Sequence, residues 1–502
     1  MRPRRWLPIA LVLAGLGPVA GPGAALGGDA EKLGPRAGPA KSLEAPRRLH
    51  SVGHITWIYA GPRKAARTEL GYIRVGDSVK VRAADPQRGA GCADFFVPIE
   101  PYGWVCLDRS VTFDESNRYL RALQSVRPRA ALLPFEYALS NGAPMYRRLP
   151  ARAEWQKAER PLGPAGSFQS LSWGNRGHEK LAEVRAIAAA DPVPDFLRAG
   201  GSAASERPLG LVRRQIPLGS MLAFSRAFEH EGRTWLLSSD LTVVPADRTR
   251  PFRTSSFRGV ELGANRSLPL AWIRGKPRPR YSRRADGSFE AGGLEWNVRT
   301  AVELENQEPV EHGKLRYLQT KERKAGAEPY WIEERDASVV RTRADLPFSV
   351  GERDKWMIVS ITQGTLVAYE GRRPVFTTLV SPGAGGVPIP GKDLVKMSTT
   401  PMGIFRVTFK HRAATMSPEK GENRSFWIAD VPHTQYFSAP FALHTAYWHE
   451  NFGEPMSAGC INLSPRDGAR LFDWSEPRVP EGWNGSAAGR ANGKGTFVVV
   501  VR

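Results

Sequence analysis

This chain contains few cysteines. It also lacks residues at metal-ligand spacing and, beyond its N-terminal region, any long apolar run. Only three cysteines occur among 502 residues. No stretch after the N-terminal region is apolar over the roughly 20 residues that a membrane-spanning helix needs. No group of His, Cys and acidic residues has metal-ligand spacing, and no Gly-rich phosphate-binding loop occurs. The sequence therefore implies neither a metal nor another cofactor.

Basic residues outnumber acidic residues in this chain. The chain has 71 Lys and Arg against 50 Asp and Glu, a formal charge of +21. Such an excess indicates an anionic neighbour, for which nucleic acid, a membrane surface and a cell-envelope polymer are the candidates. Because no zinc spacing, Arg-rich helix or aromatic RNA-binding motif accompanies the charge, we expect no nucleic-acid partner and favour an anionic envelope surface. The alternative is that the excess is solvated surface arginine.

The N-terminus has the pattern of a secretory signal over residues 1–28. Three arginines near the start precede an apolar segment, Leu7–Val19, and then small residues at Ala20–Ala25. The apolar segment is short and broken by Gly and Pro, which disfavours the alternative of an uncleaved membrane anchor. We expect export to the periplasm or cell envelope without a transmembrane span after signal removal. Residues 29–49, rich in Gly, Pro and Ala, are expected to be a flexible linker.

Cysteine usage agrees with export. Cys92 and Cys106 are near neighbours and can close a disulfide in an oxidising compartment, which leaves Cys460 as a free thiol. A free cysteine in an exported chain, set among Gly and polar residues, indicates chemistry rather than packing.

Short β-like runs dominate most of the chain, so we expect a mainly β, multidomain protein. Runs at 55–59, 70–75, 78–81, 95–99 and 103–107 predict a small β module over 50–113. Composition breaks suggest a second β module with a helical insertion over 114–250, the helix lying at 178–190. A third module or linker region would cover 251–351, and a C-terminal domain 352–502.

The end of the first module is echoed twice. Trp104, Trp235 and Trp331 each stand in a β-like run that is followed by polar residues and a short apolar run. The echo predicts up to three small β modules in series. Three unrelated core tryptophans in one larger β-rich region would give the same pattern.

The strongest chemical signal lies near the C-terminus. His444 ends an apolar strand-like run, and Cys460 follows in a Ser-Ala-Gly-Cys turn. A thiol needs a nearby base to become the attacking thiolate near neutral pH, because its unperturbed pKa is about 8.5. We therefore expect Cys460 to be a nucleophile and His444 its base.

At these positions the chain resembles the catalytic domain of the L,D-transpeptidases, cysteine enzymes that cross-link bacterial peptidoglycan. The matching residues are His444-Thr445, Ser457-Ala458-Gly459-Cys460 and Ile461-Asn462, preceded by the turn Thr400-Pro401-Met402-Gly403. Ala458 stands where His is commoner, and Asn462 where Arg is common. The resemblance implies a C-terminal β-sandwich with a short helix. The residues themselves predict a helix at 465–474, following Ser464, and a closing strand at 496–501. The first module is similar to bacterial SH3-like barrels.

The resemblance also implies roles for these residues. Cys460, His444, Thr445 and Gly459 would be catalytic, with Thr445 fixing the imidazole and the backbone N–H groups of Gly459 and Cys460 binding the oxyanion. Substrate contacts are expected from Asn462, Ser457, Trp448, His449 and Tyr436, beneath a loop or lid at 413–438. The partner would be peptidoglycan: a tetrapeptide stem donates its third residue and a second stem accepts it.

Three alternatives stay open at this stage. Water as acceptor would give an L,D-carboxypeptidase, and a protein lysine would give a protein-to-wall ligase. The third is a non-catalytic wall-binding protein, to which Ala458 lends some support.

Overall fold

The structure is a computed structural model, and it describes residues 47–126, 128–168, 171, 177–200, 210–343, 349–419, 425–489 and 491–502. The expected signal segment therefore lies outside the described residues, as does the expected linker up to residue 46. Residues 48 and 49 of that linker belong to the first strand, and Leu49 is fully buried, so the folded part starts earlier than the sequence suggests. No helix of the described residues is long and apolar enough to cross a membrane.

The first module is a small β unit, as predicted, and its short strands fall close to the expected runs. Its strands are β1 Arg48–Ser51, β2 Ile55–Tyr59, β3 Glu69–Arg74, β4 Ser78–Lys80, β5 Phe96–Pro98, β6 Trp104–Cys106 and β7 Val111–Thr112. A disulfide joins Cys92 to Cys106 across a Cα separation of 5.7 Å. Trp483, from near the C-terminus, completes the core of this module.

The second module mixes strands with three short helices. Its elements are α1 Arg118–Gln124, β8 Glu136–Ser140, β9 Pro144–Tyr146, α2 Arg152–Glu159, α3 Asp195–Arg198, β10 Val212–Gln215, β11 Met221–His230, β12 Arg233–Ser238, β13 Val243–Pro245 and β14 Thr249–Pro251. The helix expected at 178–190 is wrong: this segment is turns and irregular chain. Its backbone bonds to other elements instead, with Leu181 N–H donating to Trp448 and Ala190 N–H to Ala227. Hydrogen bonds to distant parts of the chain therefore decide the conformation of this segment, although the spacing of its apolar residues is that of a helix.

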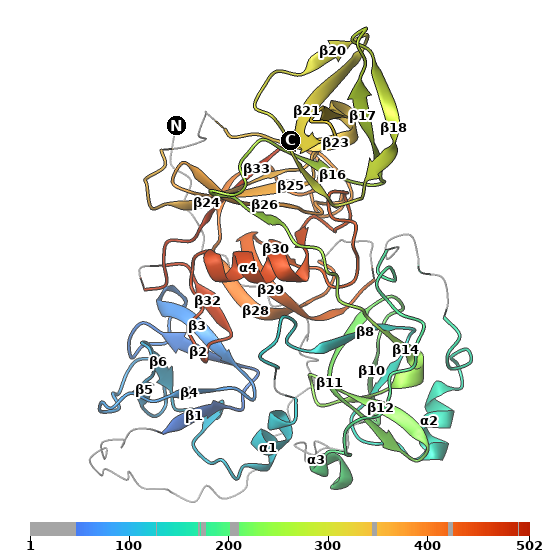
Figure 1. Ribbon diagram of the computed structural model, residues 1–502. Coiled ribbons are helices and arrows are strands. Elements are labelled where there is room, and N and C mark those ends of the chain that lie inside the picture. Colours follow the sequence, from blue (N-terminus) through green and yellow to red (C-terminus); the bar gives the residue numbers. More distant parts are fainter. Residues whose placement is uncertain are drawn as a thin grey trace, which may run out of the picture.

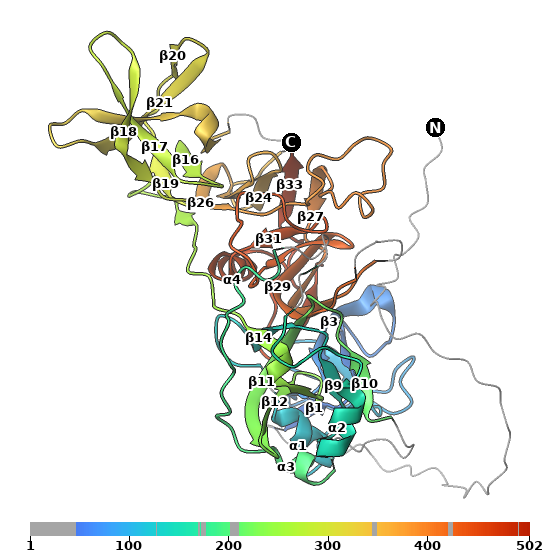
Figure 2. The ribbon, with the colours of Figure 1, turned by 90° about the vertical axis from the view of Figure 1, so that its right-hand side faces the viewer.

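The third module projects from the rest of the molecule (Figures 1 and 2). Its strands are β16 Leu270–Ile273, β17 Arg278–Arg283, β18 Phe289–Trp296, β19 Ala301–Glu303, β20 Val310–His312, β21 Leu315–Arg323, β22 Pro329–Glu333 and β23 Ala337–Val340. A 3₁₀ turn at 334–336 precedes β23, and a turn with nearly the same flanking backbone angles occupies 246–248 in the second module. Trp104, Trp235 and Trp331 all lie on strands, in β6, β12 and β22.

The C-terminal domain lies between the other modules (Figure 1). Its elements are β24 Lys355–Ser360, β25 Thr365–Glu370, β26 Arg373–Leu379, β27 Gly403–Arg406, β28 Phe409–Met416, β29 Ile428–Ser438, β30 Phe441–Thr445, β31 Ile461–Leu463, α4 Pro465–Trp474, β32 Gly485–Ala487 and β33 Phe497–Val501. The helix begins where the sequence predicts, because the Ser464 side chain accepts from Asp467 N–H and Pro465 fills the first helical position.

Two sheets enclose the core of this domain. One has the strand order β15-β26-β25-β24-β33-β27, in which β15 (Val260–Glu261) comes from outside the domain. The other contains β28 to β32, and it continues into the first module through the β32–β3 pair and into the second through the β29–β11 pair. The C-terminal domain therefore shares a continuous sheet with its two neighbours.

One expectation about this domain is only partly right. The segment 413–438 is largely the antiparallel pair β28–β29, in which Ala413 pairs with Pro432 and Ala414 with Val431. Strand β29 carries buried apolar residues such as Ala429 and Val431, which favours strand over loop. The described residues between the two strands are irregular, and Ser417, Glu419 and Phe426 among them line the cavity that contains Cys460.

Candidate active site

The cavity that contains Cys460 has a volume of about 160 Å³ and is lined by both apolar and polar side chains. Of the residues predicted from the sequence, it brings together Cys460, His444, Ser457, Asn462, Trp448 and Tyr436. Gly459, Thr445 and His449 are not among its lining residues. Met416 from β28 and Ile428 from β29 form part of the wall, and so do Ser417, Glu419 and Phe426 from the chain between these strands, so part of the expected loop does border the cavity.

Strand register places the central residues on one face. In the parallel pair β30–β31, His444 is opposite Asn462, and Leu443 is opposite Ile461. Leu443, Ile461 and Leu463 pack into the core, and side chains alternate along a strand, so His444 and Asn462 point to the other face. Cys460 directly precedes β31 and borders the same cavity.

The imidazole of His444 is held by its own chain. Its Nδ1 lies 3.1 Å from the carbonyl oxygen of Thr445, which can only accept, so Nδ1 carries the hydrogen and Nε2 a lone pair. Burial lowers the pKa of His444 to about 4, and the ring is therefore neutral at physiological pH. The Trp448 ring stacks on it at a centroid distance of 5.9 Å. His444 thus has the protonation state of a general base.

Thr445 touches the site only through its backbone. Its side-chain oxygen lies on the opposite side of the strand, 2.9 Å from Nδ1 of His433. The hydrogen bond that fixes His444 comes from the carbonyl group, so any residue at position 445 could supply it.

The turn before Cys460 depends on glycine. Gly459 has φ +122°, and a Cβ atom there would lie 2.4 Å from the Phe441 ring. Its N–H donates to Ser457 Oγ at 3.0 Å, and the same hydroxyl donates to the Cys460 carbonyl. The oxyanion role expected for the Gly459 N–H is therefore not supported, because that group already has an acceptor within the turn.

His449 is fully buried and is not among the residues that line the cavity, so the substrate contact expected from it is not supported. Its Nε2 lies 2.9 Å from the side-chain amide of Asn462, and its Nδ1 accepts from Asn451 N–H at 3.2 Å. Tyr436 does border the cavity, and burial raises the pKa of its phenol well above the usual value.

His178 is a cavity residue that the sequence did not single out. It comes from the second module, and its ring meets Trp448 edge to face at 6.1 Å. Nδ1 of His178 donates to the Gly219 carbonyl at 2.9 Å. Lys180 Nζ binds Asn451 Oδ1 at 2.6 Å, so this segment is tied to the loop after β30. Only the fold brings position 178 beside 448, and no local pattern could have indicated it.

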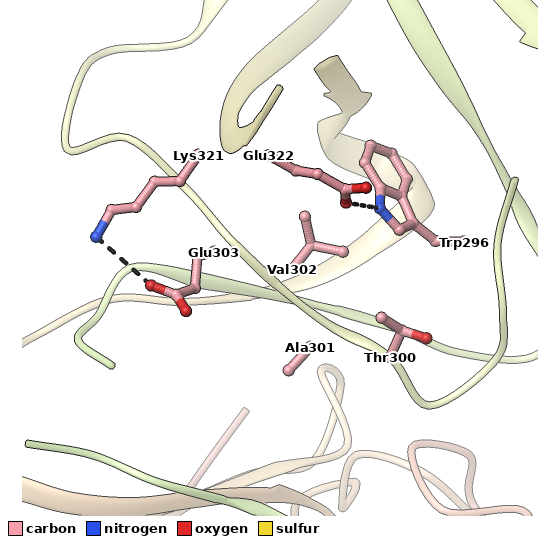
Figure 3. Close-up of a pocket in the computed structure, with 7 residues that line it drawn as sticks. All are labelled: Trp296, Thr300, Ala301, Val302, Glu303, Lys321 and Glu322. Carbon is pink, nitrogen blue, oxygen red and sulfur yellow. Dashed lines mark hydrogen bonds and ion pairs between the residues drawn. The ribbon is translucent and has the colours of Figure 1, made fainter. Parts of the chain in front are cut away.

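Another hollow lies in the third module, and Figure 3 shows its lining. Lys321 pairs with Glu303 at 3.6 Å, and Trp296 Nε1 donates to Glu322 at 2.9 Å. The described lining of this hollow contains no nucleophile beside a base, and its charged groups are paired, Lys321 with Glu303 and Glu322 with Arg280 from outside the lining. Among the described residues no group of three or more His, Cys, Asp and Glu could hold a metal ion.

Comparison with known families agrees with the geometry around Cys460. Residues 354–500 match the L,D-transpeptidase catalytic domain (YkuD). The L,D-transpeptidase domain so defined contains His444, Cys460 and the whole cavity wall except His178. No match is found among the curated proteins.

Solved structures of L,D-transpeptidases show distant similarity. A mutant L,D-transpeptidase from Enterococcus faecium is 19% identical, with 30% of this chain and 50% of that chain covered and a TM-score of 0.21. An L,D-transpeptidase from Mycobacterium smegmatis is 17% identical, with 40% of this chain and 100% of that chain covered and a TM-score of 0.22. The match spans about half the length of the E. faecium structure. Identities and TM-scores this low add nothing to the family match.

Proposed function

We propose that this protein is an exported peptidoglycan L,D-transpeptidase with Cys460 as its nucleophile. The observation that carries the proposal is the tautomer of His444: its Nδ1–H bond to Thr445 leaves Nε2 with a lone pair, and His444 lines the same cavity as Cys460. The family match over 354–500 supplies the reaction class. Export would follow from the signal-like residues 1–28, and the disulfide Cys92–Cys106 agrees with an oxidising compartment.

The reaction would run in two acyl transfers. His444 Nε2 takes the proton of the Cys460 thiol, and the thiolate attacks the carbonyl carbon of the L,D-peptide bond at the third residue of a tetrapeptide stem. The C–N bond then breaks, the imidazolium returns its proton to the leaving amine, and D-alanine departs from a thioester. In the second transfer, an amine of another stem attacks the thioester while its proton passes to His444. The C–S bond breaks and the thiol is restored.

Several neighbours would serve this chemistry. The backbone N–H of Cys460 would bind the oxyanion, whereas the Gly459 N–H donates to Ser457. Trp448 and Tyr436 would pack along the stem, and Asn462 would bind it as a neutral polar group. We add His178 to the substrate contacts, because it lines the same cavity from outside the L,D-transpeptidase domain. The module over 50–113 would be an SH3-like unit that precedes the catalytic domain.

The test is incubation of the mature protein with purified disaccharide-tetrapeptide, followed by mass spectrometry of the products. Wild type should release D-alanine and form a cross-linked dimer, and Cys460→Ala should form neither. A tripeptide without dimer would assign a carboxypeptidase, and turnover only with a lysine-bearing protein acceptor would assign a wall ligase. If wild type forms no product and Cys460 reacts with iodoacetamide no faster than free cysteine, the protein is a wall-binding module instead.

A further inference from the structure

The hydrogen bonds of His449 determine which of its two ring nitrogens carries the hydrogen. Burial lowers the pKa of His449 to about 3, so the ring is neutral and carries one N–H. The backbone N–H of Asn451 can only donate, and it points at Nδ1 at 3.2 Å. Nδ1 must therefore hold the lone pair, and Nε2 must carry the hydrogen.

This proton sets the orientation of the Asn462 amide. The group that faces Nε2–H at 2.9 Å must be an acceptor, so it is the carbonyl oxygen of Asn462 rather than its nitrogen. The two ends of an amide have the same outline, and the hydrogen-bond network decides between them. The NH₂ group then takes the other position, which is buried and has no hydrogen-bond partner among the described residues.

Asn462 itself lines the reaction cavity. It does so with Cys460, it is only 2% exposed, and it stands opposite His444 in the strand pair. A buried N–H donor without an acceptor costs free energy, so the native state calls for a partner at this position, and a ligand oxygen in the cavity would be one.

We propose that His449 is a positioning residue whose Nε2–H holds the Asn462 oxygen and so presents the Asn462 NH₂ group to a carbonyl or carboxylate oxygen of the stem peptide. The inference rests on the proposed function for the identity of the ligand. It assigns His449 no contact with the substrate. The histidine acts through one hydrogen bond to Asn462 and one from Asn451.

Kinetics of matched variants test the role. His449→Leu removes both hydrogen bonds, whereas Gln can accept from Asn451 and donate to Asn462. His411→Leu is the control, because His411 is also buried and bonds Tyr72 at the boundary with the first module. We expect His449→Leu to lower kcat/KM about tenfold to a hundredfold, His449→Gln to restore most of it, and His411→Leu to leave it within about twofold.

A double-mutant cycle separates positioning from general loss of structure. Asn462→Ala should cost about as much as His449→Leu, and the double variant no more than either, because both remove the same donor. Additive losses, or a Gln variant as poor as Leu, would overturn the proposal. Should His449→Leu fail to fold by thermal unfolding, His449→Asn replaces it, since its shorter side chain cannot reach both partners.

A measurement without turnover keeps this inference separate from the proposed function. In full-length protein labelled with ¹⁵N-asparagine, the side-chain signals lost in Asn462→Ala identify the Asn462 NH₂ group. They should shift in His449→Leu and stay in place in His411→Leu. If the signals shift but the protein has no transpeptidase activity, the contact between His449 and Asn462 is supported and the proposed function is rejected. Unchanged signals would reject the positioning role whatever the activity.

Discussion

His444 and Asn462 are register partners in the parallel strands β30 and β31. Their side chains stand next to each other on the cavity face, while the residues on the other face pack into the core. Cys460 enters this arrangement because it immediately precedes β31. The pairing of β30 with β31 thus brings the imidazole of His444 close to the amide of Asn462 and the thiol of Cys460, although these residues come from two separate segments of the chain.

The first prediction concerns the titration of His444. Its pKa is lowered to about 4 by burial, so the imidazole stays neutral as the pH falls from 8 to about 5 and becomes charged only below that. A neutral ring is needed to accept the thiol proton, so the acid limb of kcat/KM should lie well below the value near 6.5 of an exposed histidine. NMR titration of the imidazole signal that His444→Gln removes gives the midpoint directly. A midpoint of 6 or above would contradict the arrangement.

The second prediction concerns Gly459. Substitution by Ala should destabilise the fold by about 1–3 kcal/mol and abolish thioester formation, because φ +122° is strained for any side chain and the added Cβ meets the Phe441 ring. Urea unfolding and mass spectrometry of the acyl-enzyme measure the two effects. Gly386→Ala is a suitable control: Gly386 also has positive φ, but nothing lies within 4 Å of its added Cβ. If both variants keep full activity, the turn does not depend on glycine.

The third prediction concerns His178. His178→Ala should raise KM for the tetrapeptide donor about threefold to tenfold and leave kcat within about twofold, because the residue lines the cavity without belonging to the strand pair that holds His444. The control is His54→Ala, an exposed histidine in the first module. An unchanged KM would mean that His178 does not contact the donor and that the second module only packs against the loop after β30.

The fourth prediction is a pH dependence of stability from Asp467. Its carboxyl group accepts from Gly259 N–H and Thr378 Oγ1 in the interior, and burial raises its pKa to about 6. The folded state therefore binds the proton more tightly than the unfolded state. This stabilising contribution is complete below about pH 4 and is lost as the pH rises to about 6, an effect on the order of 2–3 kcal/mol.

Comparison with a variant that cannot titrate isolates this effect. The difference in unfolding free energy between wild type and Asp467→Asn should shift against wild type as the pH rises from 4 to 6, in urea titrations at matched pH. Asp473→Asn, an exposed position on the same helix, should track wild type across that range. A pH-independent difference for Asp467→Asn would show that the pKa of this carboxyl group is the same in the folded and unfolded states.

Local patterns allowed much of the architecture to be predicted. The apolar run at 496–501 located β33, and Ser464 with Pro465 located the start of α4. These succeed because alternation and capping are properties of neighbours in sequence. Residues 178–190 failed because their backbone N–H groups bond to Trp448 and Ala227, which no local pattern records.

The sequence by itself determined the candidate nucleophile, its base and the glycine between Ser457 and Cys460, since the spacing of residue types follows the chemistry of thiol activation. Only the tertiary structure decided that His178 borders the cavity and that His449 is sealed behind Asn462. It also decided that the first and second modules share a sheet with the L,D-transpeptidase domain. The physical reason is that burial and hydrogen-bond partners depend on packing between distant segments, whereas strand, turn and cap preferences depend on the chain nearby.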